Sequence, residues 1–319
     1  MNNKKRLLII PAANNMNFLA DIAKALEEKF EIDVFDSTKE QNIPNNRQYS
    51  YIWLEWADGY PLYMATKFTK EKLCGTKVIL RIHRYELFQK RTLSLIAEIN
   101  PNIIDKLLFV SEYVKQIGIS MFPWMERGEV IPNLIDHTKF PFHDRKRGKN
   151  ILFLGRISYV KNLPFLMQLF YELLKFDPYY KLHIVGDIAD KELYYFKENF
   201  IKKIPYLNIG ENIIFHGRIE NSQLPDIMNE IHYIVCTSIF ESQGVGILEA
   251  MATGIKPIVY NFGGAEDIFP DKYLFMTRSE FLENIMQNSY NPREYHDFVI
   301  KNFSIKENLG LYIKAIEGR

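Results

Sequence analysis

Cysteine is nearly absent from this chain of 319 residues, which contains only Cys74 and Cys236. The two thiols are far apart and each lies in an apolar stretch, which favours reduced, packed side chains over a disulfide or a metal site. Long hydrophobic runs are missing too, and none approaches the roughly 20 residues that cross a bilayer. The apolar run after Arg6 meets Pro11 and Asn14 too early for a signal peptide. We therefore expect a cytoplasmic protein, free or peripheral on the inner face of the cell membrane.

An excess of one charge is also lacking, because 40 Lys+Arg against 39 Asp+Glu leave a net charge of +1. We therefore expect no nucleic-acid partner. Residues 67–91 are an exception in which only Glu71 and Glu86 are acidic. The basic residues of this stretch are Lys67, Lys70, Lys72, Lys77, Arg81, Arg84, Lys90 and Arg91. Such a stretch could bind a phosphate-bearing acceptor or an anionic membrane surface, although a solvated helix face and a loop explain it equally well.

Short β-rich runs alternate with longer helical patterns, which is typical of β-α units around parallel sheets. The first half of the chain predicts strands at residues 6–10, 32–35, 51–54, 77–82, 106–110 and 128–131. The second half predicts strands at residues 150–154, 180–185, 213–216, 233–237, 256–260 and 273–276. Helical spacing predicts the first crossover helix over residues 17–29 and the last helix over residues 305–316. The sequence thus predicts an α/β fold with two Rossmann-like sheets.

Periodicity is interrupted between the two series of strands. Pro141 and the charged cluster at residues 144–149 indicate a linker there. We place the boundary near residue 140 and expect domains over residues 1–140 and 141–300. The helix within residues 301–319 has no strand after it, so it is free to cross back toward the N-terminal domain.

Two cations follow the predicted strand at residues 150–154. Arg156 and Lys161 lie between this strand and a helix that Asn162 is expected to cap. Their loop is at the carboxyl end of a parallel strand, where α/β proteins bind ligands. The pair could stabilise a diphosphate, because a departing nucleoside diphosphate gathers negative charge.

A glycine-containing loop follows the predicted strand at residues 233–237. Gly244 and Gly246 let the backbone approach a ligand, and N–H groups of a helix that starts near Val245 would bind phosphate. Glu249 lies about one turn inside this helix, where its carboxylate could accept hydrogen bonds from a ribose diol. Glu241 precedes the glycines and would lie nearer a bound sugar.

The two carboxylates also carry a family resemblance. Glu241 and Glu249, with seven residues between them and Ala-Met-Ala-x-Gly-x-x-Pro after them, resemble the hallmark of family 4 retaining glycosyltransferases, the glycosyl transferases group 1. Further stretches resemble this family in the same order, at residues 110–115, 131–136, 155–156 with 161–162, and 263–267. The resemblance covers about residues 106–316. It implies the GT-B fold, in which two Rossmann-like domains face a central cleft and the C-terminal helix packs back toward the N-terminal domain.

The resemblance also implies roles for individual residues. Residues 1–140 would bind the acceptor and residues 141–300 the nucleotide-sugar donor. Arg156 and Lys161 would hold the diphosphate and Glu249 the ribose. The sugar and phosphates would be bound by Glu241 and the backbone of Gly244, Val245 and Gly246.

In the N-terminal half, His83 matches a histidine that these enzymes often place near the sugar, so it joins Glu241, Arg156 and Lys161 as a predicted catalytic residue. Arg84, Tyr85 and Glu55 are candidate acceptor contacts. The chain departs from the family after its first strand, where Pro11 replaces the usual glycines. Gln243 and Gly246 replace the more usual phenylalanine and proline of the donor loop.

The implied activity is retaining transfer of a sugar from a nucleotide diphosphate sugar to a hydroxyl of a glycan or lipid-linked acceptor in cell-surface polysaccharide assembly. A UDP-sugar is the first expectation and a GDP-sugar the second. We expect no cofactor and no metal, because two cations serve the diphosphate and an Asp-x-Asp motif is absent. A nucleotide-sugar epimerase and a non-catalytic sugar-nucleotide binding subunit remain alternatives. A glycosidase is disfavoured because phosphate-binding features separate the two carboxylates, and a nicotinamide dehydrogenase is excluded by the lack of a Gly-x-Gly-x-x-Gly loop.

Overall fold

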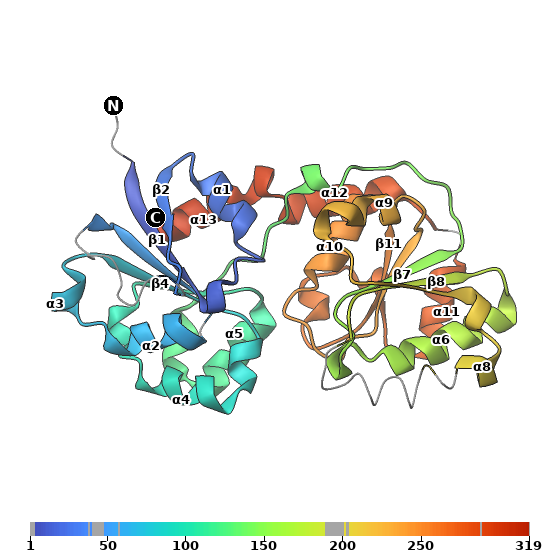
Figure 1. The fold of residues 1–319 in the computed structure, drawn as a ribbon, viewed down its shortest axis with the longest axis horizontal. Helices are drawn as coiled ribbons and strands as arrows, with labels where there is room; N and C mark the ends of the chain where they lie inside the picture. The colour runs from blue at the N-terminus through green and yellow to red at the C-terminus, as the bar shows by residue number, and fades with distance from the viewer. Residues whose placement is uncertain are drawn as a thin grey trace. The chain divides into compact units, whose positions relative to one another are not determined.

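The computed structural model describes residues 4–37, 39, 48–56, 58–188, 201, 204–287 and 289–318. The chain divides into two compact units, which we call unit 1 (Met1–Ile135 with Phe303–Arg319) and unit 2 (Asp136–Asn302). Each contains one six-stranded sheet whose paired strands are all parallel (Figure 1). Among the described residues, no helix is both long and apolar enough to span a bilayer.

The sheet of unit 1 has the strand order β2-β1-β3-β4-β5-β6. Its strands are β1 Lys5–Pro11, β2 Phe30–Val34, β3 Tyr51–Glu55, β4 Lys77–Ile82, β5 Lys106–Phe109 and β6 Glu129–Val130. Its helices are α1 Ala20–Leu26, α2 Gly59–Lys67, α3 Lys70–Leu73, α4 Lys90–Glu98, α5 Glu112–Met121 and α13 Ile305–Glu317.

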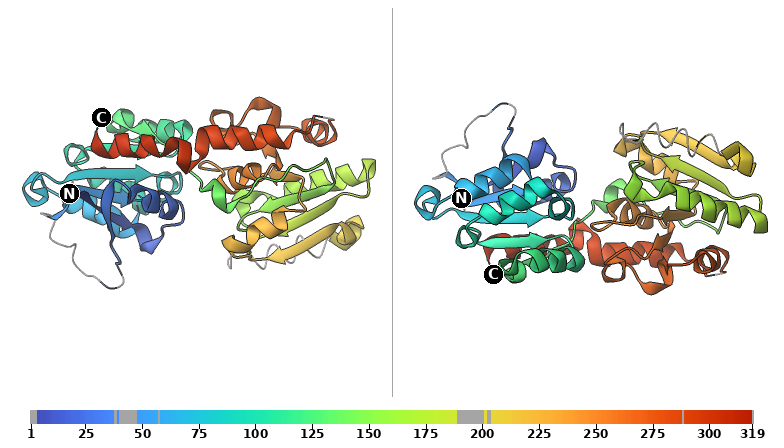
Figure 2. Two further views of the ribbon diagram at one scale, coloured as in Figure 1. Left: turned by 90° about the horizontal axis from the view of Figure 1, so that it is seen from above. Right: turned by 90° about the horizontal axis from the view of Figure 1, so that it is seen from below.

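Helices cover both faces of this sheet because successive strand residues point to opposite sides (Figure 2). On one face, Leu7 and Ile9 of β1 pack with Tyr312 of α13. On the other face, Leu8 of β1 packs with Leu62 of α2. The C-terminal helix α13 therefore returns to unit 1, where it contacts α1.

The sheet of unit 2 has the order β12-β11-β10-β7-β8-β9. Its strands are β7 Asn150–Leu154, β8 Lys181–Val185, β9 Ile213–Gly217, β10 Tyr233–Cys236, β11 Lys256–Tyr260 and β12 Leu274–Phe275. Its helices are α6 Leu163–Phe176, α8 Ile204–Leu207, α9 Leu224–Met228, α10 Val245–Ala252, α11 Arg278–Met286 and α12 Pro292–Phe303, the last residue of which belongs to unit 1.

The predicted α/β fold is confirmed, and all twelve predicted strands are present, but two of the local predictions for unit 1 are wrong. The helix predicted over residues 17–29 is shorter, because the chain turns at Met16, where Leu19 N–H donates to the Met16 carbonyl, and α1 begins only at Ala20. Cys74 was expected to be packed, yet it is exposed at the end of α3 with a left-handed φ of 50°. Cys236 is buried, as expected.

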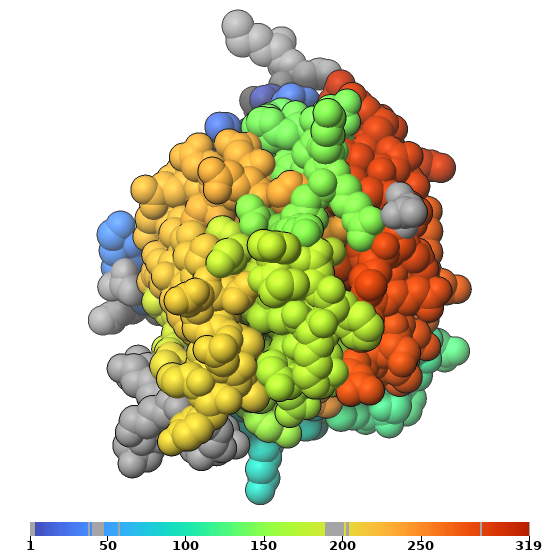
Figure 3. All heavy atoms as spheres, turned by 90° about the vertical axis from the view of Figure 1, so that its right-hand side faces the viewer, coloured from blue at the N-terminus to red at the C-terminus, as the bar shows by residue number. Residues whose placement is uncertain are grey.

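The segment after Asp136 lies along the surface of unit 2 (Figure 3). Its basic cluster is nevertheless anchored. Arg145 donates to the carbonyls of Met228 at 2.7 Å and Thr253 at 2.8 Å, and Arg147 donates to the hydroxyl of Tyr233 at 3.0 Å. The charged residues that predicted a linker thus hold this segment against unit 2.

His232 is expected to make the stability of unit 2 dependent on pH. Its Nδ1 accepts the Asn150 N–H at 3.3 Å, which requires an unprotonated nitrogen. Burial, and second the charge of Arg145, lower the pKa of His232 below its ordinary value. When the pH falls through the ordinary histidine range, the unfolded chain therefore binds more protons than the folded chain. The free energy of unfolding decreases in this range.

We expect the free energy of unfolding of unit 2 to decrease between pH 7 and pH 5. In His232→Asn, the amide oxygen can accept the same N–H without titrating, so the decrease should be smaller. Urea unfolding followed by circular dichroism across this pH range measures the difference. Equal slopes in the two proteins would contradict the assignment.

Candidate functional site

The strand order of unit 2 defines where a ligand should bind. The chain proceeds from β7 through β8 to β9 in one direction, then returns past β7 to β10 and continues in the other. The direction therefore reverses between the neighbours β7 and β10. In open α/β sheets, ligands bind beyond the carboxyl ends of the strands at this reversal.

The loop after β7 carries the two predicted diphosphate ligands. Gly155 has a φ of +149°, and a Cβ atom there would lie 3.4 Å from Lys161 Cε, so glycine leaves room for this lysine. Arg156 is exposed and Lys161 is partly buried. Asn162 occupies the position before α6 with a left-handed φ of 49°, but its side chain makes no capping hydrogen bond, so that prediction is wrong.

The loop after β10 is fastened to the loop after β7 by its backbone and by one hydroxyl. Ile239 N–H donates to the Val160 carbonyl at 2.8 Å, and Thr237 Oγ1 donates to the Lys161 carbonyl at 3.0 Å. Thr237 has no exposed area. These bonds fix the backbone of Lys161 relative to the end of β10.

The side chains of Lys161 and Glu241 meet across the two loops. Lys161 Nζ forms an ion pair and a hydrogen bond with Glu241 Oε1, and Ser238 Oγ donates to the same oxygen at 2.7 Å. The side chains of Lys161 and Glu241 are 23% and 15% exposed, so the pair is shielded but still reachable. Two residues eighty positions apart are thus brought together at the reversal point.

The start of α10 completes this site. Gly244 precedes the helix with a left-handed φ of 76°, so glycine is required to turn the chain into α10. Val245 and Gly246 form the first turn, whose N–H groups lack partners within the helix. A Cβ atom at Gly246 would lie 4.0 Å from Glu249 Oε2, which shows that the half-buried Glu249 lies beside this turn.

The thiol next to the site is uncharged. Burial, and second the charge of Glu241, raise the pKa of Cys236 to about 11. The charges at the end of β10 are therefore carried by Lys161 and Glu241. No group of His, Cys, Asp and Glu able to hold a metal occurs within the part of the chain that the structure describes.

Unit 1 contains a second polar cluster at the ends of β3 and β4. The register places Glu55 opposite Arg81, and Arg81 Nη1 donates to Glu55 Oε1 at 3.2 Å with both side chains fully buried. Trp53 Nε1 donates to Glu55 Oε2 at 2.8 Å, and His83 Nε2 lies 2.9 Å from Oε1. Burial alone would raise the pKa of Glu55, but the Arg81 charge and the bonds from His83 and Trp53 outweigh it, so the pKa is lowered. The carboxylate is ionised, and His83 Nε2 donates to it.

Glu55 therefore supports His83 and cannot contact an acceptor as predicted, because its side chain has no exposed area. His83 itself is 1% exposed and is covered by Trp56, whose ring is stacked on the imidazole at 4.0 Å. Contact between His83 and a sugar requires the indole to move. Arg84 is partly buried and lies over the Phe88 ring, and Tyr85 is half exposed, so their acceptor contacts stay predictions.

Sequence reasoning missed three residues of these clusters. Ser238 and Thr237 hold Glu241 and Lys161 in place, and Arg81 neutralises Glu55. The basic stretch at residues 67–91 predicts an exposed Arg81, but this side chain is fully buried. A signal was available, because β3 and β4 are neighbouring apolar strands that place opposite charges in register, at Glu55 and Arg81.

The fold of the whole chain and the sequence of unit 2 both resemble those of known proteins. The crystal structure of Anabaena HepE in complex with UDP and glucose superposes with a TM-score of 0.81 at 15% identity, covering 99% of this chain and 100% of that one. The chain, with one parallel sheet in each unit, therefore has the GT-B fold. The family model described as Glycosyl transferases group 1 matches residues 136–302, more than half of the chain. The chain belongs to this family, which confirms the resemblance; its placement in family 4 stays a prediction.

The curated relatives are longer proteins, of which only part matches this chain. Mannosylfructose-phosphate synthase of Agrobacterium fabrum is 26% identical over 194 residues, which are 57% of this chain and 40% of that protein. Alpha-monoglucosyldiacylglycerol synthase of Streptococcus pneumoniae is 25% identical over 184 residues, 53% of this chain and 40% of that protein. The chain thus spans less than half the length of these relatives.

Proposed function

We propose that this chain is a retaining hexosyltransferase that moves a sugar from a nucleotide diphosphate sugar to a hydroxyl of a glycan or lipid-linked acceptor. The observation that carries the proposal is the Lys161–Glu241 pair at the reversal point of the unit 2 sheet. Family membership supports it. The UDP and glucose bound to HepE favour a UDP-sugar over a GDP-sugar, and the diacylglycerol in one relative's name supports a lipid-linked acceptor. Cell-surface polysaccharide assembly is the proposed setting.

In the proposed reaction, the bond between the anomeric carbon and the β-phosphate oxygen breaks, and the acceptor oxygen bonds to that carbon on the same face. The acceptor proton passes to the departing phosphate. The ammonium group of Lys161 has three N–H donors, so it can keep its hydrogen bond to Glu241 while it donates another to the diphosphate. Arg156 is exposed and adds a second positive charge, and Glu241 offsets positive charge on the sugar. No cofactor or metal takes part in this scheme.

Donor binding is the direct test. We expect Glu249→Ala to weaken the binding of UDP-glucose about tenfold or more, because a hydrogen bond to a charged group contributes about 1.5–3 kcal/mol. Isothermal titration calorimetry measures the change. Glu283→Ala, which removes an exposed carboxylate from α11, is the matched control.

A panel of UDP- and GDP-sugars, each with and without a glycan or lipid acceptor, separates the alternatives. Transfer that requires the acceptor supports the proposal, whereas an epimeric nucleotide sugar formed from the donor alone indicates an epimerase. Binding without any reaction indicates a non-catalytic subunit. Normal donor affinity in Glu249→Ala would remove the ribose assignment.

Contact with an anionic membrane is a further part of the proposal. Only some of the cations in residues 67–91 can take part in this contact. Arg81 is fully buried, so it is excluded from this surface. Lys67, Lys70 and Lys72 are exposed around the end of α2 and in α3. Each cation near an anionic surface contributes about 1 kcal/mol.

We expect the wild-type protein to sediment with phosphatidylglycerol vesicles at low salt. The triple variant K67Q/K70Q/K72Q should bind them at least about 10-fold more weakly, and phosphatidylcholine vesicles should bind neither protein. Salt-insensitive binding, or equal binding of the triple variant, would argue against this surface.

A further inference from the structure

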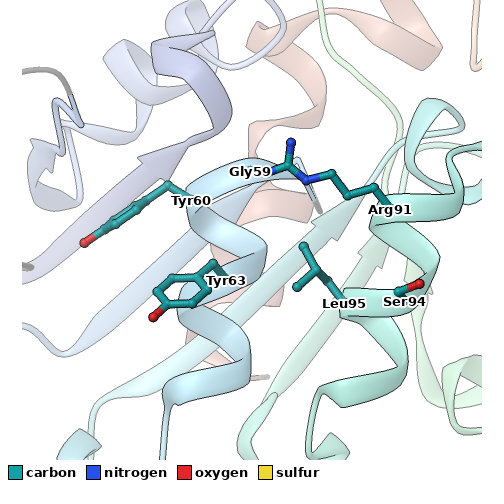
Figure 4. A pocket seen from close by; sticks show the side chains of 6 residues that line it. All are labelled: Gly59, Tyr60, Tyr63, Arg91, Ser94 and Leu95. Carbon is teal, nitrogen blue, oxygen red and sulfur yellow. The ribbon is translucent and has the colours of Figure 1, made fainter.

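A pocket of about 540 Å³ lies between α2 and α4 of unit 1, apart from the predicted donor and acceptor residues (Figure 4). Its lining consists of Gly59, Tyr60, Tyr63, Arg91, Ser94 and Leu95. The volume falls in the range of small-molecule sites, about 300–1,000 Å³. Because α2 follows β3 and α4 follows β4, the first turns of both helices lie toward the carboxyl edge of the sheet, the edge that carries His83.

One wall of the pocket is aromatic. The ring of Tyr60 is stacked on Phe35 at 5.1 Å with an interplanar angle of 7°, which holds it in place. Tyr63, one turn further along α2, is 48% exposed. Figure 4 shows Leu95 of α4 pointing into the space opposite Tyr63. The flat apolar face of such a ring suits the C–H face of a sugar.

The other wall carries a cation, Arg91. Arg91 is exposed, and its guanidinium has neither a hydrogen-bond nor an ion-pair partner within the described ranges. Figure 4 shows it reaching from α4 toward Gly59. Lys67 Nζ lies 5.3 Å from the Tyr63 ring and adds positive charge nearby. The neighbouring Asp58 caps α2, with its carboxylate accepting the Gly59 N–H at 2.6 Å.

We propose that this pocket binds an acidic sugar unit of the acceptor, with the sugar ring against Tyr63 and its carboxylate paired with Arg91. The planar guanidinium matches a carboxylate through two parallel hydrogen bonds, which a neutral sugar cannot accept with the same strength. The inference rests on the proposed function, because it assigns the chemical class of the acceptor. It adds a recognition site that is separate from the donor residues of unit 2.

The test uses the full chain on a glycan array that carries uronic-acid, phosphorylated and neutral oligosaccharides. We expect the wild-type protein to retain uronic-acid oligosaccharides in preference to neutral ones. Arg91→Gln should lose at least about 10-fold in this binding. Arg218→Gln, an exposed arginine of unit 2, should behave as wild type. Tyr63→Ala should lose binding and Tyr63→Phe should keep it, because the ring and not the hydroxyl covers the sugar.

Three results would overturn the inference: no retention of acidic saccharides by the wild type, equal retention of neutral ones, or unchanged binding in Arg91→Gln. If Arg91→Gln weakens binding only to phosphatidylglycerol vesicles, the pocket serves a membrane surface instead. UDP-glucose titration of the same variants keeps the two proposals apart. If the protein binds acidic saccharides but no nucleotide sugar, the pocket proposal is supported and the proposed function is wrong. If it binds the nucleotide sugar but no acidic saccharide, the pocket proposal is wrong and the proposed function is supported.

Discussion

Replacing Lys161 with alanine is expected to lower the turnover of sugar transfer by about 100-fold, the scale of losing one preorganised donor to a developing anion. The structure gives a reason for this size of effect. The backbone of Lys161 is tied to the end of β10 by Thr237, and its ammonium is held by Glu241, so the charge is already in place before the diphosphate departs. Little reorganisation then remains for the reaction step.

Steady-state kinetics with the donor and acceptor found in the panel measure this effect. Lys161→Arg should recover part of the turnover because it restores the charge, although the guanidinium has a different shape. Lys175→Ala, which removes an exposed lysine from α6, is the matched control. An unchanged kcat in Lys161→Ala would show that this lysine does not stabilise the leaving group. Thermal unfolding of each variant separates loss of chemistry from loss of folding.

The fold could be predicted because each strand is a short apolar run bounded by polar or turn residues. The ends of elements are set by contacts that the pattern does not encode. The backbone turn at Met16 delays the start of α1 to Ala20, although the apolar spacing begins earlier. Likewise, Tyr273 belongs to the turn before β12, which reduces a predicted strand of four residues to Leu274–Phe275.

The site in unit 2 could be predicted in outline for a topological reason. Arg156, Lys161 and Glu241 lie on loops that follow strands, and parallel strands bring all such loops to one edge of the sheet. The pairing of Lys161 with Glu241 could not be predicted, since it depends on β7 and β10 being neighbours in the sheet. Hydrophobic periodicity predicts where strands lie in the sequence, but it does not predict which strands are neighbours in the sheet.

The polar cluster of unit 1 could not be predicted from the sequence, because it depends on the burial of Arg81. A basic stretch in a sequence is normally solvent-exposed, so the pattern at residues 67–91 predicts that Arg81 lies at the surface. Its burial depends on partners distant in sequence: Glu55 on β3, Asn133, and Tyr312 on α13. Only the sheet register and the return of the C-terminal helix bring these groups together.

Removal of Arg81 alone should therefore be one of the most destabilising single changes in unit 1. We expect Arg81→Leu to lower the free energy of unfolding by about 3–5 kcal/mol, because it leaves the buried Glu55 carboxylate without its cation. Tyr312 would also lose the donor that lies 2.9 Å from its hydroxyl. Urea unfolding followed by tryptophan fluorescence measures the loss in this unit specifically, because Trp53, Trp56 and Trp124 are the only tryptophans of the chain and all belong to unit 1.

The double variant R81L/E55L decides whether the missing charge partner is the cause. Without the carboxylate, no buried charge is left uncompensated, so the double variant should be less destabilised than the sum of the two single variants. Lys106→Ala breaks the ion pair with Glu129, which is more exposed, and should cost at most about 1 kcal/mol. Additive losses in the double variant would assign the stability to packing of the Arg81 stem. A double variant less destabilised than that sum would instead show that Arg81 stabilises unit 1 as the charge partner of Glu55, the carboxylate that lies 2.9 Å from the predicted catalytic His83.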